Sequence, residues 1–327
     1  MTSHDLASRD LDGARVLVTG AAGFVGSHLC EQLIRSGASV IGLDNLSTGR
    51  RQNLCALTGE RSFTFLDGDV TLPHPVHGPL DAIMHLASPA APRDYLALPV
   101  ATLRAGALGT LNMAELARQK GARLLLASTS EVYGDPLEHP QAESYLGNVN
   151  PIGPRSVYDE AKRFAEAVTA QAGRTGVRTA IARIFNTYGP RMSGADSRMV
   201  PTFIRQALAG APLTIAGDGT QTRSLCYVDD TVEGLIRLLT CGFADPVNIG
   251  GTHEITVLEL AHLIRDLCGS RSPITFVDLP ADDPRRRRPD ITRAARVLGW
   301  EPQVSLREGL ARTLAWERRQ VTAGAVA

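Results

Sequence analysis

Two residues four positions apart, Tyr158 and Lys162, could together perform acid–base chemistry. On a helix their side chains would share one face, because residues four apart are neighbours on the helix surface. A fixed ammonium beside a phenol favours the phenolate and therefore lowers the pKa of the tyrosine. The pair predicts a base that takes the proton of a substrate hydroxyl while a hydride leaves the same carbon. A surface tyrosine that merely lies near a lysine is the alternative.

A glycine-rich segment near the start of the chain favours the catalytic interpretation. Gly20, Gly23 and Gly26 follow an apolar run at 15–19 that is typical of a buried strand, and they open a helical pattern. Glycines there permit a tight turn and a close approach of the backbone to a pyrophosphate. The helix N-terminus supplies unpaired N–H groups for the same negative charge. The segment therefore predicts a dinucleotide-binding loop.

Asp44 closes the second predicted strand, 18 residues beyond Gly26. A carboxylate there accepts hydrogen bonds from ribose hydroxyls and repels a 2′-phosphate, which favours NAD over NADP. Arg50 and Arg51 lie close in the sequence and keep NADP open as an alternative. Asp69 follows the third predicted strand and is either a contact of the adenine or an ordinary turn residue.

The elements that must position these residues alternate between strand and helix. We expect strands at 15–19, 38–43, 63–66, 81–86, 123–128 and 178–185, with helices at 23–36, 99–119 and 157–174. This alternation predicts an α/β fold, with a Rossmann-type, doubly wound parallel sheet that helices cover on both faces.

The pattern changes after residue 186, where glycine and proline become frequent. Helical patterns return at 200–209, 228–240, 257–268 and 306–318, and a short strand is expected at 246–249. We interpret this half as a smaller C-terminal substrate lobe interleaved with the first domain. Residues 1–185 should form the NAD-binding Rossmann domain, with 226–250 returning to it. Residues 186–225 and 251–327 should form the lobe.

The composition excludes several classes of protein. The 327 residues carry 34 basic and 34 acidic side chains, and this neutral balance argues against nucleic-acid or membrane binding. No apolar run approaches the roughly 18 residues of a transmembrane helix, and the polar start is not a signal peptide. The five scattered cysteines indicate reduced thiols in a cytoplasmic protein. The histidines lack metal-ligand spacing, so no metal is expected.

Taken together, the glycine loop, the segment 128–131 and the Tyr-x-x-x-Lys pair resemble the extended short-chain dehydrogenase/reductase superfamily. Within it, the chain is similar to the UDP-glucuronate decarboxylase (UDP-xylose synthase) family over about 15–316. The most specific stretches are 128–136, 139–141, 147–155, 158–160, 183–192, 217–223, 282–284, 287–291 and 298–302. The resemblance implies that the smaller lobe binds a sugar nucleotide.

One position separates this family from its neighbours. Sugar-nucleotide 4,6-dehydratases typically carry Thr-Asp-Glu where this chain has Thr129, Ser130 and Glu131, and their aspartate is the acid for water loss. A serine hydroxyl is too weak an acid for that step, whereas carbon dioxide leaves without a proton. Family epimerases usually lack a glutamate at the position of Glu131. Dehydratase and 4-epimerase remain the alternatives, followed by a noncatalytic NAD- or sugar-nucleotide-binding protein, which the intact Thr129, Tyr158 and Lys162 disfavour.

The resemblance implies NAD-dependent decarboxylation of UDP-glucuronate to UDP-xylose through a UDP-4-keto-hexuronate. Tyr158 would take the C4 hydroxyl proton while NAD takes the hydride, Thr129 would hydrogen-bond the same oxygen, and Lys162 would hold the ribose. The 4-keto group is beta to the carboxylate, so carbon dioxide loss leaves a stabilised enolate. C5 is then protonated and the bound NADH returns its hydride. Glu131, with Ser130, would serve the C5 and carboxylate chemistry at a step left open.

The remaining site residues also follow from the resemblance. The implied cofactor residues are Gly20, Gly23, Phe24, Val25, Gly26, Asp44, Asn45, Asp69, Leu86, Tyr158 and Lys162. The implied substrate residues are Glu131, Asn186, Arg223, Asn248 and Arg287, with Arg288 an alternative to Arg287. An arginine suits an anionic sugar nucleotide through its bidentate guanidinium.

Three positions depart from the family pattern. Gly106 stands for a usual asparagine, Leu146 for a tryptophan and Ala216 for an aromatic residue. These departures concern sugar and base specificity rather than the redox chemistry. Many members pair through two helices, so 99–119 and 157–174 are expected to form the interface of a homodimer.

Overall fold

A parallel sheet of seven strands forms the centre of the computed structural model, which describes residues 11–73, 76–192 and 197–324. Its strand order is β11-β6-β5-β4-β1-β2-β3. The strands are β1 (Arg15–Thr19), β2 (Ser39–Asp44), β3 (Phe63–Asp67), β4 (Ala82–His85), β5 (Arg123–Thr129), β6 (Thr179–Ile184) and β11 (Val247–Ile249). Because the order reverses between β1 and β4, the predicted Rossmann-type, doubly wound sheet is confirmed.

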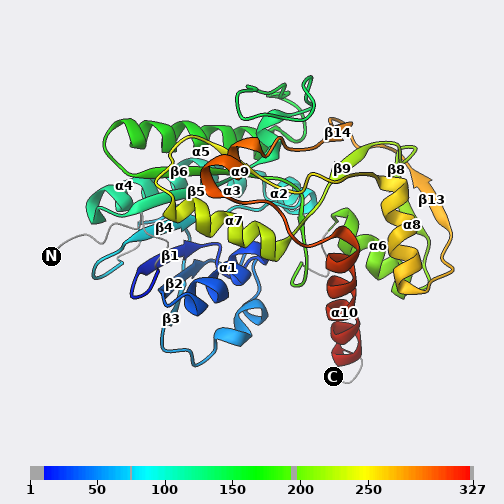
Figure 1. Ribbon diagram of the computed structural model, residues 1–327, viewed down its shortest axis with the longest axis horizontal. Coiled ribbons are helices and arrows are strands. Elements are labelled where there is room, and N and C mark those ends of the chain that lie inside the picture. The colour runs from blue at the N-terminus through cyan, green and yellow to red at the C-terminus, as the bar shows by residue number, and fades with distance from the viewer. Residues whose placement is uncertain (1–10, 74–75, 193–196, 325–327) are drawn as a thin grey trace.

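The strands are apolar on both faces because both faces are covered. Along β1, Val16 and Val18 pack into one core cluster while Leu17, on the opposite face, packs into another. Helices α1 (Phe24–Arg35) and α7 (Val228–Thr240) pack together on the first face, and α4 (Thr110–Lys120) and α5 (Ser156–Arg174) on the second (Figure 1). This burial on two sides explains why the strand sequences lack polar alternation.

A smaller lobe lies beside one end of the sheet, at the right of Figure 1. Strand β8 (Leu213–Ala216) pairs with β13 (Ile274–Val277), and β9 (Thr222–Ser224) pairs with β12 (Glu254–Thr256) and β14 (Arg286–Arg287). Its helices are α6 (Met199–Leu208), α8 (Val257–Cys268) and α10 (Leu306–Gly324). Helix α8 begins where Thr256 and Glu259 form a capping box, a pattern that is readable from sequence.

The remaining elements connect the sheet and the lobe. Strand β7 (Thr187–Tyr188) pairs with β10 (Cys226–Tyr227), and α9 (Thr292–Leu298) packs on α7. The short elements η1 (Arg51–Leu57), α2 (Pro92–Ala97) and η3 (Ser130–Tyr133) follow or precede strands of the sheet. Within the described ranges, none of the helices combines the length and apolar character that a bilayer crossing requires.

The predicted helix 99–119 is interrupted rather than uniform. It comprises α3 (Pro99–Arg104), a π-helical turn η2 (Ala105–Gly109) and then α4. A Cβ at Gly106 would lie 2.7 Å from the Cβ and the carbonyl oxygen of Ala161 on α5. Because Gly106 has no side chain, the backbone of η2 can approach that of α5 closely beneath the site.

Candidate active site

The loop between β1 and α1 is shaped for close approach by a ligand. Gly20 has a φ of +71°, a left-handed conformation that side chains rarely adopt. A Cβ at Gly26 would lie 2.0 Å from the Gly20 carbonyl oxygen, so only glycine lets the loop and the helix meet. Gly23 is the N-cap of α1 and no side chain caps the helix, which leaves its first N–H groups for an anion.

Asp44 ends β2 beside this loop and is buried. Its carboxylate accepts hydrogen bonds from the backbone N–H groups of Ala22 at 2.9 Å and Leu46 at 2.8 Å. Burial raises the pKa of this carboxyl, and the two donors oppose the rise. Asp44 therefore also braces the loop, which sequence reasoning did not anticipate. Asn45 donates to Asp69 at 3.0 Å, so two further predicted cofactor residues lie together.

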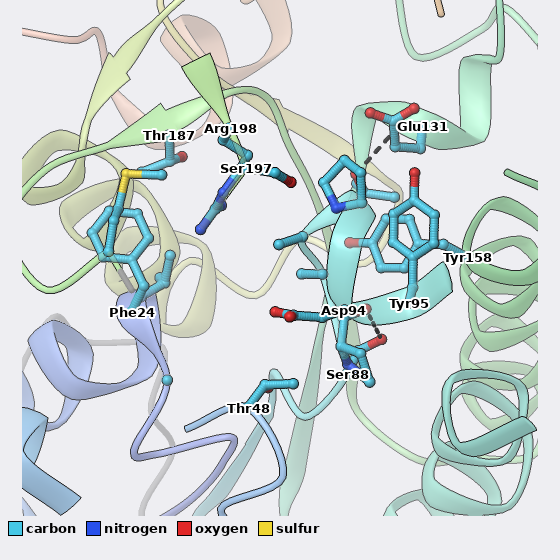
Figure 2. Close-up of a pocket in the computed structure, with 18 of the residues that line it drawn as sticks. Phe24, Thr48, Ser88, Asp94, Tyr95, Glu131, Tyr158, Thr187, Ser197 and Arg198 are labelled. Atoms are coloured by element: carbon cyan, nitrogen blue, oxygen red, sulfur yellow. Dashed lines mark hydrogen bonds between the residues drawn. The ribbon is translucent and has the colours of Figure 1, made fainter. Parts of the chain in front are cut away.

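A pocket of about 1080 Å³ extends from the loop to the C-terminal lobe. It lies along the carboxyl ends of the strands, near the point where the strand order reverses, where doubly wound sheets bind ligands. In Figure 2, Phe24, Thr187 and Arg198 lie across the pocket from Glu131 and Tyr158. The predicted site residues that line it are Gly20, Gly23, Phe24, Val25, Gly26, Asp44, Asn45, Asp69, Leu86, Thr129, Ser130, Glu131, Tyr158, Lys162, Asn186, Arg223 and Arg287.

Tyr158 and Lys162 lie one turn apart on α5 and both are buried. The Lys162 Nζ is 5.8 Å from the centroid of the Tyr158 ring and donates to the Ala127 carbonyl at 2.8 Å. Burial raises the pKa of the Tyr158 phenol, and a hydrogen bond with Thr129 opposes the rise. Burial also lowers the pKa of Lys162 to about 8. The expected lowering of the tyrosine pKa is wrong for the protein alone, because loss of water, together with Glu131 and Asp159, outweighs the opposing effects of Thr129 and Arg198.

Glu131 is the centre of a chain of buried charges. Arg155 donates to its Oε2 at 2.7 Å, and Arg287 donates to its Oε1. Arg155 also lies 3.6 Å from Asp283, which accepts a hydrogen bond from Arg223 at 2.8 Å. Burial would raise the pKa of Glu131, but Arg287 and Arg155 hold it well below its usual range. Glu131 is therefore ionised, and the chain of charges joins η3 of the sheet side to β9 and β14 of the lobe.

The structure bears on two of the expected substrate positions, the choice between Arg287 and Arg288 and the assignment of Asn248. Arg287 is 2% exposed and lines the pocket, whereas the Arg288 side chain is 41% exposed and lies 4.0 Å from Glu254. The arginine available to the pocket is therefore Arg287. Asn248 is a correction, because it is fully buried outside the pocket lining. Its side chain accepts from Tyr133 and donates to the Gln141 and Asp290 carbonyls, so its capacity is used within the protein.

Comparison with known proteins gives the family. The model of the NAD dependent epimerase/dehydratase family matches residues 16–250. The chain belongs to this family. It is 50% identical to UDP-glucuronic acid decarboxylase 1 of Danio rerio, over 95% of this chain and 74% of that protein. It is 53% identical to UDP-glucuronic acid decarboxylase 6 of Arabidopsis thaliana, over 90% and 86%. Both levels of the predicted resemblance are confirmed.

Solved structures of epimerase/dehydratase members share the fold. The dTDP-glucose 4,6-dehydratase DesIV of Streptomyces venezuelae, with NAD and TYD bound, gives a TM-score of 0.86 at 31% identity, covering 94% of this chain and 98% of that one. The UDP-glucose 4-epimerase of Thermotoga maritima, with UDP-glucose, gives 0.86 at 30% identity, covering 94% and 99%. The fold by itself is therefore compatible with dehydratases, epimerases and decarboxylases.

The cofactor of the epimerase/dehydratase family fits this chain. NAD needs a glycine cradle for its pyrophosphate and a carboxylate at the end of the second strand for its ribose. Gly20 and Gly26 form a cradle that a Cβ would fill, and Asp44 lines the pocket from β2. NAD dependence is accordingly confirmed, with the backbone N–H groups at the start of α1 available to the diphosphate.

Three residues at the site were missed by sequence reasoning. Tyr95 is 2% exposed, and its ring stacks on that of Tyr158 at 5.2 Å between centroids. Its hydroxyl has no hydrogen-bond partner among the described residues, although it lies on the pocket wall (Figure 2). Arg155 and Asp283 lie in stretches that carried the family resemblance, so that signal could have found them. No sequence signal pointed to Tyr95.

The three family departures have different surroundings in the structure. Ala216 lines the pocket from β8, where a small side chain leaves space. Leu146 is 84% exposed and does not line this pocket. Gly106 is buried against α5, where its missing side chain serves helix packing. Of the three, Ala216 is the one that lines the pocket.

Proposed function

We propose that this chain decarboxylates UDP-glucuronate to UDP-xylose through a UDP-4-keto-hexuronate. Identity of about half with UDP-glucuronic acid decarboxylases, over most of both chains, supports that activity. The observation that carries it is the cluster of Glu131, Arg155 and Arg287 on the pocket wall beside Tyr158. The buried Arg287 and the half-buried Arg155 share one carboxylate there, which leaves positive charge for an acidic sugar.

Residues of α5 and β5 prepare the C4 hydroxyl for oxidation. NAD, when bound, accepts a hydride from C4 of the sugar and later returns it. Thr129 and Tyr158 both line the pocket, and the Thr129 side chain acts to lower the pKa of the Tyr158 phenol, so both are placed to meet one sugar oxygen. Tyr158 accepts the hydroxyl proton, and its buried phenolate would be stabilised by the positive charge of an oxidised cofactor bound in the pocket. Lys162, which the Ala127 carbonyl holds in place, would hold the cofactor ribose.

The arginine cluster serves the carboxylate step. The 4-keto group makes the C6 carboxylate a beta-keto acid, whose carbon dioxide departs with its bonding electrons left on C5 as an enolate. Arg155 and Arg287 hold the sugar carboxylate before it leaves, and Tyr158 and Thr129 donate hydrogen bonds to the enolate oxygen. Glu131 orients both arginines and is ionised, so it has no proton to supply at rest. C5 then takes up one proton to give the UDP-4-keto-pentose, which becomes UDP-xylose once C4 regains its hydride and O4 regains the proton that Tyr158 had accepted.

Ser130 argues against the 4,6-dehydratase reaction, in which water is lost. It is 2% exposed at the start of η3 and lines the pocket, where 4,6-dehydratases place a carboxylic acid. A serine hydroxyl lacks the acidity to protonate a departing hydroxide, whereas decarboxylation has no such requirement. The 4-epimerase reaction is disfavoured by Glu131, which epimerases usually lack.

We propose a division of labour between the two halves of the chain. Residues 1–185, with 226–250, bind NAD, while 186–225 and 251–327 bind the sugar nucleotide. The position of β11 at the edge of the central sheet supports the return of 226–250. Asn186 and Arg223, which line the pocket from the lobe side, are proposed to bind the diphosphate.

We also propose a homodimer that pairs through α4 and α5. Both helices carry apolar side chains that are about half exposed, which is unusual for a surface in contact with water. These residues are Leu111 on α4 and Phe164 on α5, with Leu108 on the adjoining η2 and Val100 and Leu103 on α3. A cytoplasmic location is proposed because all five cysteines are free, as a reducing compartment would keep them.

The test is turnover of defined substrates by the purified protein with NAD. UDP-glucuronate should release carbon dioxide and yield UDP-xylose, identified by mass and by chromatography against a standard. UDP-glucose, which lacks the carboxylate, is the matched control and should give no pentose. Unchanged UDP-glucuronate together with water loss from dTDP-glucose would transfer the assignment to a dehydratase, and UDP-galacturonate as the product would transfer it to an epimerase.

A further inference from the structure

Asp159, the neighbour of Tyr158, is a buried carboxylate that the reaction described above does not use. It lies in the first turn of α5 and is 6% exposed. Its Oδ1 is fully buried and has no hydrogen-bond partner among the described residues. A buried carboxylate oxygen without a partner is costly, and such groups persist where they have a role.

The surroundings of Asp159 are the charges of the pocket wall. The groups that act on it electrostatically are Glu131 of η3, Arg155 and Glu160 of its own segment, and Arg287 of β14, and Asp159 acts in turn on Tyr95 of α2 and on Tyr158. Arg155 and Arg287 are already hydrogen-bonded to Glu131. With Asp159 neutral, Arg155 and Arg287 outnumber Glu131 by one charge, since the charges of the neighbouring Asp283 and Arg223 cancel each other. With Asp159 ionised, the cluster is neutral.

We propose that Asp159 is a positioning residue whose neutral acid form leaves the net positive charge of Arg155 and Arg287 to the carboxylate of the substrate. The ionised form cancels that net positive charge, so the two arginines attract the substrate carboxylate less strongly. Asp159 thereby sets the affinity for acidic over neutral sugar nucleotides. This inference rests on the proposed function, since it concerns the acidic sugar of the same pocket.

The electrostatics agree with a neutral acid. Burial raises the pKa of Asp159 to about 7, Glu131 adds to the rise, and Arg155 and Arg287 oppose it. The carboxyl is therefore protonated below about pH 7 and ionised above it. Affinity for UDP-glucuronate should fall as the pH rises through that range, while affinity for UDP-glucose should not.

The experiment measures binding to the NAD-loaded Tyr158→Phe protein, in which turnover is blocked. Calorimetric titrations with UDP-glucuronate and with UDP-glucose are made at pH 6.0 and pH 8.5. The comparison is repeated with Asp159→Asn added, which keeps the shape and removes the charge. Glu160→Gln is the matched control, because it removes one negative charge at the next position, where the side chain is 39% exposed. KM and kcat of the chains with an intact Tyr158 are measured over the same range.

We expect UDP-glucuronate to bind about tenfold more weakly at the higher pH in the parent and in the Glu160→Gln protein. In the Asp159→Asn protein the change should be below twofold, with the difference in KM rather than in kcat. A weakening shared equally by UDP-glucose would overturn the proposal, even if the Asn variant failed to fold. So would a tenfold loss that persisted in a folded Asn variant. Absence of carbon dioxide release from the wild type at any pH would instead sink the decarboxylase assignment.

Discussion

Burial from water sets the pKa values of the individual residues at the site. Burial raises the pKa of Tyr158 and lowers that of Lys162, so the charged form of each residue is disfavoured in the protein alone. Glu131 is the opposite case, because Arg155 and Arg287 lower its pKa by more than burial raises it. The working protonation states therefore depend on which opposite charges are present, and the oxidised cofactor is one of them.

At this scale Tyr158→Phe should abolish turnover while NAD binding persists. The ring and its stacking on Tyr95 remain, but no group is left to accept the hydroxyl proton, so kcat should fall about 10³-fold. Retained NAD is measured by absorbance after protein denaturation. Tyr145→Phe, a tyrosine outside the pocket lining, should keep full activity. Near-normal turnover of the Tyr158 variant would contradict the assignment of the base.

Glu131→Gln should lose both activity and stability at neutral pH. The amide leaves Arg155 and Arg287 without their carboxylate, which costs about 3 kcal/mol of unfolding free energy. Because the folded pKa of Glu131 is lowered, its contribution is fully present above the unfolded value and is lost as the pH falls below it. Urea unfolding should show the largest gap between wild type and variant at pH 7 and a smaller one near pH 4. A pH-independent gap would contradict the charge-based explanation.

At the scale of elements, the site depends on how closely helices and loops approach one another. The N-terminus of α1 meets the loop after β1 because Gly26 has no side chain. The turn η2 meets α5 because Gly106 has none, and α5 carries Tyr158, Asp159 and Lys162. Substitutions in these contacts should therefore reach the chemistry through helix position.

Gly106→Val should destabilise the fold by about 2 kcal/mol, because its side chain would overlap Ala161. The shift of α5 should also reduce kcat, since it moves Tyr158 relative to Thr129. Thermal unfolding and turnover are measured together. Adding Ala161→Gly should recover part of the stability by removing the Cβ contact at 2.7 Å. If Gly106→Val alone were neutral in both assays, the close approach would not constrain the site.

On the scale of the whole molecule, the pocket exists because two lobes of the chain meet over the sheet edge. Glu131 and Arg155 come from the sheet side, while Arg223, Asp283 and Arg287 come from the lobe. These charged residues link the two lobes and also line the pocket that is proposed to bind the substrate. The exposed apolar side chains of α4 and α5 lie on the outside of the same molecule and motivate the proposed dimer.

Leu111→Asp should convert the proposed dimer to a monomer. The side chain is 47% exposed on α4, and a charge there would be buried without a partner in a paired interface. Light scattering after size exclusion gives the mass. Leu137→Asp is the control, because this leucine is 82% exposed but lies on neither helix. A wild type that is monomeric at micromolar concentration would refute the proposal outright.

Much of the site could be predicted because its residues lie at local landmarks. Gly20, Asp44 and Thr129 follow or end strands, and Tyr158 and Lys162 are one helical turn apart, so their spacing along the chain already implies their proximity. Asn248 was misplaced because its surroundings come from residues more than 40 positions away, including Gln141 and Asp290. Its burial depends on contacts that no local pattern encodes.

By itself, the sequence predicted the doubly wound sheet and the cofactor loop, because periodicity and short motifs express local chemistry. The acidic sugar followed from the resemblance to a known family, and Tyr158 as the base stays a prediction. Only the tertiary structure decided that Arg287 rather than Arg288 lines the pocket and that Tyr95 stacks on Tyr158. It also decided that the Asp159 Oδ1 is buried with no hydrogen-bond partner in the described part of the chain. Those properties depend on which distant surfaces exclude water. That is a matter of packing between elements, and it governs pKa and affinity more strongly than neighbours in the chain do.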